Sequence, residues 1–211
     1  MIRLTIDPAR PLAGQLAVAV DAIRHGQVVA FPTDTLYGLA VDPRSDAALD
    51  ALYALKGRNA DRRVALIAAS LAQAEEVAEI AGVARRLGER FWPGPVTLVV
   101  PARGGLASRS VSAEGLVGIR VPDHHVARAL ADACGYPLTA TSANVTGSAG
   151  LSLPDEVADA LPDVAVLLDA GPSPGGPPST LIEATGVDVR LLREGALPWS
   201  RVVEFLSTPP S

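Results

Sequence analysis

The chain has 211 residues, of which 48% are hydrophobic and only 4% aromatic, and its formal net charge is −5. This length and composition suit a single domain whose core is built mainly from small aliphatic side chains, as in α/β proteins. The acidic balance argues against a broad basic surface for nucleic acid, although it is compatible with a local basic cleft.

Apolar runs alternate with helix signals along the chain. The spacing of Leu16, Val20 and Ile23 predicts a first helix, and Ser45 is placed to cap a second one. We expect helices over residues 13–25, 46–56, 71–81, 83–91, 124–134, 155–161 and 199–207. We expect strands over residues 27–31, 64–69, 96–100, 117–121, 137–141, 164–169, 180–184 and 188–193. A short glycine-containing turn joins the last two strands, so we predict a mixed α/β sheet.

We expect one domain over residues 1–206 and a frayed tail over residues 207–211. No apolar run reaches the roughly 20 residues that cross a bilayer. The first residues, M-I-R-L-T-I-D-P, also lack the apolar core of a signal peptide. These features predict a cytoplasmic location without membrane contact. The single cysteine, Cys134, is expected to be a buried small hydrophobe.

A cluster of two hydroxyls and a carboxylate follows the strand predicted over residues 27–31. This cluster is Thr33-Asp34-Thr35. Ligands of α/β proteins sit outside the carboxyl ends of strands, and hydroxyls can both donate and accept hydrogen bonds. The alternative is a plain turn closed by the Thr and Asp side chains.

Four cations lie at and after the end of the helix predicted over residues 46–56, namely Lys56, Arg58, Arg62 and Arg63. Such a concentration of like charge favours an anionic partner, and phosphate suits both lysine and arginine. The alternative is that these cations only complement the helix dipole.

Three further segments carry polar groups. The run T-A-T-S-A-N-V-T-G over residues 139–147 contains Thr141, Ser142 and Asn144. Its backbone N–H groups can form an anion-binding concavity, although an ordinary turn is the alternative. Arg120 stands in the apolar strand V-G-I-R-V-P, so it either faces solvent at a sheet edge or binds a buried partner. Weaker candidates are Ser179-Thr180 and Arg193.

One motif match is rejected. Gly171-Pro-Ser-Pro-Gly175 fits the pattern G-x-S-x-G, but a nucleophile elbow needs a helix after the serine. The prolines on both sides of Ser173 make such a helix unfavourable.

Taken together, these segments resemble the YrdC-like family, whose members include threonylcarbamoyl-AMP synthases. The matching pieces cover most of the chain and occur in the family's order. They are F-P-T-D-T-L-Y-G-L (31–39), K-G-R (56–58), F-W-P-G-P-V-T-L-V-V (91–100), I-R-V-P-D-H (119–124), T-S-A-N-V-T-G (141–147), S-T-L-I-E (179–183) and L-R-E-G (192–195). The chain departs from the family at Asp34 and Pro178, where the family commonly has Glu.

The resemblance implies a twisted, open, mixed sheet with flanking helices and a central concave cleft. It also implies a nucleotidyltransferase that makes threonylcarbamoyl-AMP and pyrophosphate from L-threonine, bicarbonate and ATP, with Mg²⁺ accompanying ATP and no metal ligands from protein side chains. The product would pass to a tRNA threonylcarbamoyltransferase complex that modifies adenosine 37, so any contact with tRNA would be indirect.

The resemblance also implies roles for individual residues. The catalytic cations would be Lys56 and Arg58. Threonine would be held by Thr33, Thr35, Arg120 and Ser179. The nucleotide would be held by Lys56, Arg58, Thr141, Ser142, Asn144 and Arg193.

Two other functions compete with this one. The first is a non-catalytic, RNA-binding member of the same fold, which would release no pyrophosphate. The second is a carbamoyl-transfer relative of the kind used in hydrogenase maturation. Such domains usually occur beside acylphosphatase and zinc-finger segments, which this sequence does not contain.

Overall fold

The structure is a computed structural model that describes residues 1–11, 13–57, 64–145 and 147–208. The described helices are α1 (Ala13–Arg24), α2 (Asp46–Leu55), α3 (Leu71–Val77), α4 (Gly82–Phe91), α5 (His125–Cys134), α6 (Pro154–Ala160) and α7 (Trp199–Ser207), with a 3-10 turn, η1 (Ser108–Ser110). The described strands are β1 (Ile2–Thr5), β2 (Val29–Phe31), β3 (Gly38–Ala40), β4 (Ala65–Ile67), β5 (Val96–Pro101), β6 (Leu116–Arg120), β7 (Leu138–Ser142), β8 (Val166–Asp169), β9 (Thr180–Glu183) and β10 (Arg190–Arg193).

The strands form one sheet in the order β1-β8-β2-β3-β7-β4-β6-β5-β9-β10. Neighbouring strands run parallel in pairs such as β4 with β6 and β5 with β9. They run antiparallel around β7 and between β9 and β10. The mixed sheet predicted from the short turn between the last two strands is therefore confirmed.

Several helix ends follow local chemistry. Ser45 caps α2 by accepting a hydrogen bond from the Ala48 amide at 3.2 Å. Gly135 ends α5 in the left-handed conformation, with φ at 79°. The helix expected over residues 71–81 ends early, at Val77, because Ala78 instead forms a β-bridge with Ala102.

The hydrophobic core lies on both faces of the sheet. In β2, Val29 and Phe31 face the cluster that contains α1 and α5, whereas Ala30 faces the cluster that contains α2. This alternation follows the pleat of a strand. A third cluster packs α3, α4 and α7 against β4, β5, β6 and β9. Cys134 is buried in the α1 and α5 cluster, as the sequence predicts.

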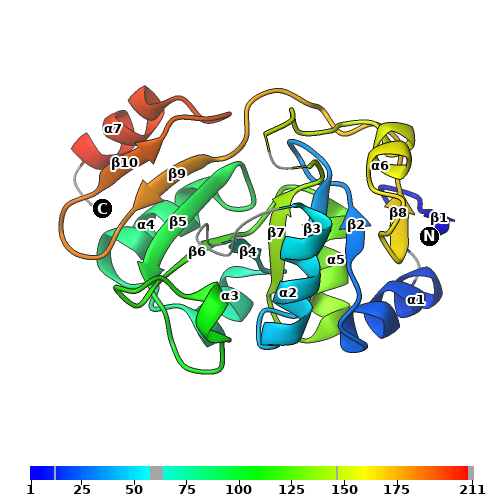
Figure 1. The fold of residues 1–211 in the computed structure, drawn as a ribbon. Coiled ribbons are helices and arrows are strands. Elements are labelled where there is room, and N and C mark those ends of the chain that lie inside the picture. Colours follow the sequence, from blue (N-terminus) through cyan, green and yellow to red (C-terminus); the bar gives the residue numbers. More distant parts are fainter. Residues whose placement is uncertain (12, 58–63, 146, 209–211) are drawn as a thin grey trace.

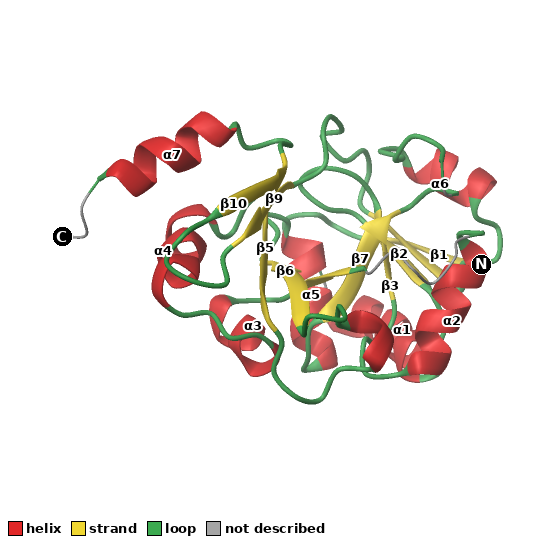
Figure 2. Ribbon diagram, turned by 60° about the vertical axis from the view of Figure 1, so that its left-hand side comes forward, coloured by secondary structure: helices red, strands yellow, loops and turns green. Residues whose placement is uncertain are grey.

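The two termini lie at opposite ends of the sheet (Figure 1). β1 lies at the end near the N-terminus, and β10 lies at the opposite end with α7 beyond it (Figure 2). β7 separates β1, β8, β2 and β3 from the remaining strands. Within the described residues, no helix is both long and apolar enough to cross a membrane. α7 ends at Ser207, as does the helix predicted over residues 199–207.

Candidate functional site

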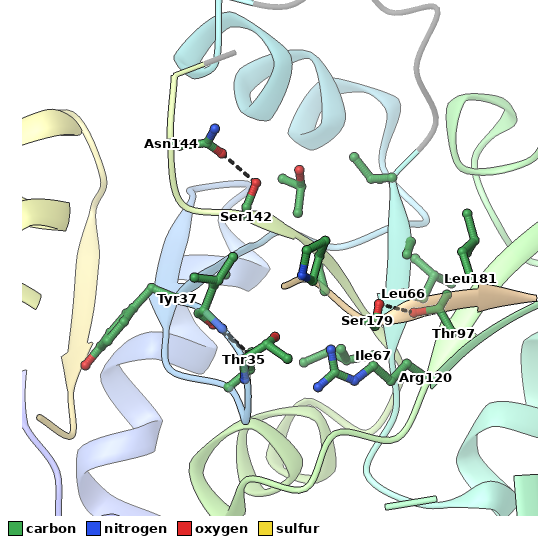
Figure 3. Close-up of a pocket in the computed structure, with 18 of the residues that line it drawn as sticks. Thr35, Tyr37, Leu66, Ile67, Thr97, Arg120, Ser142, Asn144, Ser179 and Leu181 are labelled. Carbon is green, nitrogen blue, oxygen red and sulfur yellow. Dashed lines mark hydrogen bonds between the residues drawn. The ribbon is translucent and has the colours of Figure 1, made fainter. Parts of the chain in front are cut away.

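A concave pocket of about 460 Å³ opens where the two groups of strands meet. Residues of β3, β4, β5, β6, β7, β9 and β10 and of four connecting segments line it (Figure 3). All of the described residues to which the family resemblance assigns a role line this one pocket, whereas the neighbouring candidates Asp34 and Thr180 do not. The lining residues with an assigned role are Thr33, Thr35, Lys56, Arg120, Thr141, Ser142, Asn144, Ser179 and Arg193. Arg58, Arg62 and Arg63 lie outside the described residues.

The turn between β2 and β3 supplies Thr33 and Thr35. The Thr33 hydroxyl donates to the Leu36 carbonyl at 2.6 Å and accepts from the Thr35 amide at 3.1 Å. It also lies 3.1 Å from the Thr35 hydroxyl. The plain-turn alternative is therefore correct for Thr33 as a local structure, and the same turn presents both hydroxyls to the pocket.

The loop between β8 and β9 braces this turn. The Gly175 amide donates to the Thr35 carbonyl at 2.8 Å, and the Tyr37 hydroxyl donates to the Gly171 carbonyl at 2.7 Å. Ser173 lies within this loop, and no helix follows it before β9. The rejection of a nucleophile elbow at Ser173 is consistent with this geometry.

Lys56 lies at the C-terminal end of α2 and is 2% exposed. Its ammonium donates to the Ser142 carbonyl at 2.5 Å, to the Asn144 carbonyl at 2.9 Å and to Asn144 Oδ1 at 3.1 Å. The Ser142 hydroxyl donates to the same Oδ1 at 2.5 Å. Lys56 thus places a positive charge on the pocket wall and ties the segment after β7 to α2.

Arg120 is the last residue of β6 and is 7% exposed. Its Nε donates to the Gly94 carbonyl at 3.0 Å, and its Nη2 donates to the Asp34 carboxylate. Burial lowers the pKa of the guanidinium, while the negative charge of Asp34 acts in the opposite direction. Of the two alternatives for Arg120, exposure at a sheet edge is excluded, because β6 lies inside the sheet between β4 and β5.

A pair of buried hydroxyls lies on the same side of the pocket as Arg120, across from Ser142 and Asn144 (Figure 3). The Ser179 hydroxyl shares a hydrogen bond of 2.8 Å with Thr97 on β5. Arg193 Nη2 donates to the Ser179 carbonyl at 2.9 Å, and partial burial lowers the pKa of Arg193. The segment before β9 is therefore fixed through both its side chain and its backbone.

The sequence reasoning missed Thr97 and the apolar part of the pocket. Leu66 and Ile67 on β4 and Leu181 on β9 form an apolar wall beside these hydroxyls. Thr97 had one detectable signal, since it is the only hydroxyl in the apolar run Val96–Val100. The three aliphatic residues carry no such signal because they resemble any other strand residue.

The fold and the pocket define an α/β protein with a polar, partly cationic crevice at the centre of a mixed sheet. The family model named Sua5_yciO_yrdC, described as "Telomere recombination", matches residues 21–195. The chain belongs to this family, as the sequence motifs predicted.

Named relatives and a solved structure agree with this membership. A Vibrio cholerae protein called threonylcarbamoyl-AMP synthase is 38% identical over 87% of this chain and 99% of its own length. A Pyrococcus abyssi protein of the same name is 35% identical over 91% of this chain. The crystal structure of P. abyssi Sua5 complexed with L-threonine covers 98% of this chain with a TM-score of 0.92 and 32% identity. The chain spans 57% of the length of the P. abyssi relative and 61% of that solved chain.

Proposed function

We propose that this protein is a threonylcarbamoyl-AMP synthase, which converts L-threonine, bicarbonate and ATP to threonylcarbamoyl-AMP and pyrophosphate. The observation that carries the proposal is the convergence of Arg120, Lys56 and Arg193 with several hydroxyls in one pocket. Such a pocket suits an amino acid beside a triphosphate. The names of the relatives point to the same reaction.

The reaction consists of two displacements. The amine of L-threonine attacks the carbon of bicarbonate, which loses water after proton transfer, and a carbamate forms. A carbamate oxygen then attacks the α-phosphorus of ATP, and the bond from this phosphorus to the β-phosphate oxygen breaks. Pyrophosphate leaves. No covalent enzyme intermediate is required, so positioning and charge stabilisation supply the rate.

The pocket offers groups for each part of the substrates. The Arg120 guanidinium is assigned to the threonine carboxylate, with Thr33, Thr35 and Ser179 around the amino acid. The positive charge of Lys56 would stabilise the negative charge that grows as pyrophosphate departs. Nucleotide contacts are assigned to Lys56, Thr141, Ser142, Asn144 and Arg193. The catalytic and nucleotide-binding role of Arg58 stays a prediction from the sequence.

Mg²⁺ is proposed to enter with ATP. Within the described residues, no three His, Cys, Asp or Glu side chains gather in a way that could hold a metal ion. The hydroxyls and carbonyls of the pocket suit a hydrated ion carried by phosphates. When bound, Mg²⁺ would neutralise phosphate charge.

We further propose that the product passes to a tRNA threonylcarbamoyltransferase complex in the cytoplasm for modification of adenosine 37, with no direct hold on tRNA by this chain. The alternative is a non-catalytic, RNA-binding member of the same fold. Pyrophosphate release separates the two, because only the synthase needs L-threonine and bicarbonate to release it.

The test is a pyrophosphate assay with ATP and Mg²⁺, in which L-threonine and bicarbonate are omitted in turn. We expect release only when both are present, together with a product of the mass of threonylcarbamoyl-AMP. Release that does not depend on L-threonine, or no release at all, would contradict the proposal.

A further inference from the structure

Asp34 is a charged residue beside the pocket that does not itself line it. Its neighbours Thr33 and Thr35 both do. The Asp34 side chain is 13% exposed, and its carboxylate accepts a hydrogen bond from Nη2 of Arg120. The β2–β3 turn therefore reaches across β7 and β4 in the strand order to contact β6.

Two acceptors fix the orientation of the Arg120 guanidinium. Gly94 accepts from Nε at 3.0 Å and Asp34 accepts from Nη2. A guanidinium is planar and carries five N–H groups, so contacts on two different nitrogens define its plane. In Figure 3 the guanidinium extends toward the turn that carries Thr35. Arg120 lines the pocket. A ligand can therefore accept hydrogen bonds from the guanidinium N–H groups that Gly94 and Asp34 do not use.

The ion pair also explains how a buried cation is held in place. An uncompensated guanidinium at this depth would be costly, and the carboxylate of Asp34 offsets that cost. His124, at the start of α5, also interacts electrostatically with Asp34. Burial lowers the pKa of His124, so at neutral pH it adds little positive charge that could draw Asp34 away from Arg120.

We propose that Asp34 is the positioning residue of the amino-acid carboxylate subsite, because it holds Arg120 in the plane that meets the substrate carboxylate. This inference rests on the proposed function, which assigns that carboxylate to Arg120. Without the charge on Asp34, the Gly94 carbonyl is the one strong acceptor that the described residues leave to Arg120, and the guanidinium can turn away from the substrate. The binding affinity should therefore decrease only for ligands that carry a carboxylate.

The experiment compares two ligands by calorimetry. L-threonine has the carboxylate, and L-threoninamide replaces it with a neutral amide. We expect Asp34→Asn to raise the Kd for L-threonine about tenfold, within the range of couplings between contacting charged residues. The Kd values for L-threoninamide and ATP should stay within about twofold. Asp34→Glu, which keeps the charge, should recover most of the lost affinity.

Asp42→Asn is the matched control. Asp42 also pairs with an arginine, Arg44, at 2.8 Å, and its side chain is 15% exposed, but it does not line the pocket. This variant should bind L-threonine as the wild type does. Arg120→Ala removes the guanidinium and shows how far the Kd for L-threonine rises when the carboxylate subsite is lost completely.

The outcomes separate this inference from the function on which it rests. An unchanged Kd for L-threonine in folded Asp34→Asn overturns the positioning role, and so does an equal loss for both ligands, which would indicate general distortion. If Asp34→Asn does not fold, the smaller neutral variant Asp34→Ser is measured against the same expectations. Wild-type protein that binds no L-threonine would instead contradict the proposed function.

Discussion

Thr97 and Ser179 join their hydroxyls in a hydrogen bond of 2.8 Å, although they lie 82 positions apart in the sequence. The parallel register of β5 and β9 brings them together, because Val96 pairs with Thr180. Both hydroxyls are buried and lie beside Leu181. A hydroxyl pair next to an apolar side chain suits a β-hydroxy amino acid that carries a methyl group. The hydroxyl of such a ligand can hydrogen-bond to the pair, and its methyl can pack against the apolar side chain.

Thr97→Val should therefore weaken selectivity for L-threonine. Valine has nearly the same shape but no hydroxyl, so Ser179 loses its partner at a cost of about 1 kcal/mol in unfolding free energy. We expect the Kd for L-threonine to rise several-fold, while that for L-2-aminobutyrate, which lacks the β-hydroxyl, changes little. Calorimetry with both ligands measures this ratio. Thr5→Val, at an exposed position on β1, is the control, and an unchanged ratio in Thr97→Val would contradict the assignment.

Lys56 is the only lysine of the chain, whose Lys and Arg residues total 18. Its compact ammonium meets three oxygen atoms of Ser142 and Asn144. The planar fork of an arginine does not fit three acceptors arranged around one nitrogen. Both the Ser142 to Asn144 segment and the local positive charge therefore depend on this side chain.

Lys56→Arg is expected to lose at least about tenfold in pyrophosphate release even though the charge is kept, because the wider head group displaces the segment that it holds. Lys56→Ala, which removes the charge as well, should lose more while its far-UV circular dichroism stays native. Arg24→Lys, on the exposed end of α1, is the control for a conservative cation exchange. Full turnover in Lys56→Arg would show that charge alone is needed at this position.

Gly195 packs directly against the backbone that carries Ser179. A Cβ at this position would lie 2.0 Å from the Pro178 carbonyl oxygen and 2.6 Å from the Ser179 carbonyl carbon. Real Cβ atoms do not approach backbone so closely, and a backbone neighbour cannot give way as a flexible side chain can. The pocket wall at Ser179 therefore requires glycine at position 195.

Gly195→Ala should move the Ser179 segment and reduce turnover more than about tenfold, with a lowered Tm. Gly186→Ala is the matched control in the connection between β9 and β10, since a Cβ there meets no atom within 4 Å. Pyrophosphate release and thermal unfolding measure the two effects. Equal activities of the two variants would refute the steric argument.

Much of the fold is predictable because the signals are local. Ser45 and Gly135 mark helix ends through their own chemistry, and α7 begins and ends where the sequence places it. β3 was missed because Gly38–Ala40 is short and follows a polar turn. Its conformation comes from pairing with β2 and β7, which are contributed by other parts of the chain. β1 was missed for a similar reason, since its partner β8 lies far along the chain.

The site residues divide in the same way, into those with a local signal in the sequence and those whose contacts join distant parts of the chain. Hydroxyls and cations after strand ends could be recognised as a group because ligands bind there. The bond between Arg120 and Asp34 could not be recognised, since it joins residues 86 positions apart. The sequence left open whether Arg120 faces solvent, and only the strand order places β6 inside the sheet.

Cys134 links burial to stability at alkaline pH. Burial raises the pKa of its thiol to about 11 from a usual value of 9.0. Above pH 9 the unfolded chain releases this proton while the folded protein keeps it, so the contribution of the thiol to stability is present below pH 9 and is lost as pH rises toward 11. The pKa values of Tyr37 and Tyr136, raised to about 12 from 10.0, produce a similar loss only above pH 10. Of these three groups, the thiol should therefore cause most of the loss of stability between pH 9 and 10.

Cys134→Ala should flatten the decline in unfolding free energy between pH 9 and 10, even though the smaller side chain lowers stability at pH 8. Urea unfolding at pH 8, 9 and 10 gives the slope for each protein. Thr5→Val, which leaves the thiol in place, should keep the slope of the wild type. Parallel slopes for wild type and Cys134→Ala would show that the thiol has the same pKa in the folded and unfolded chain.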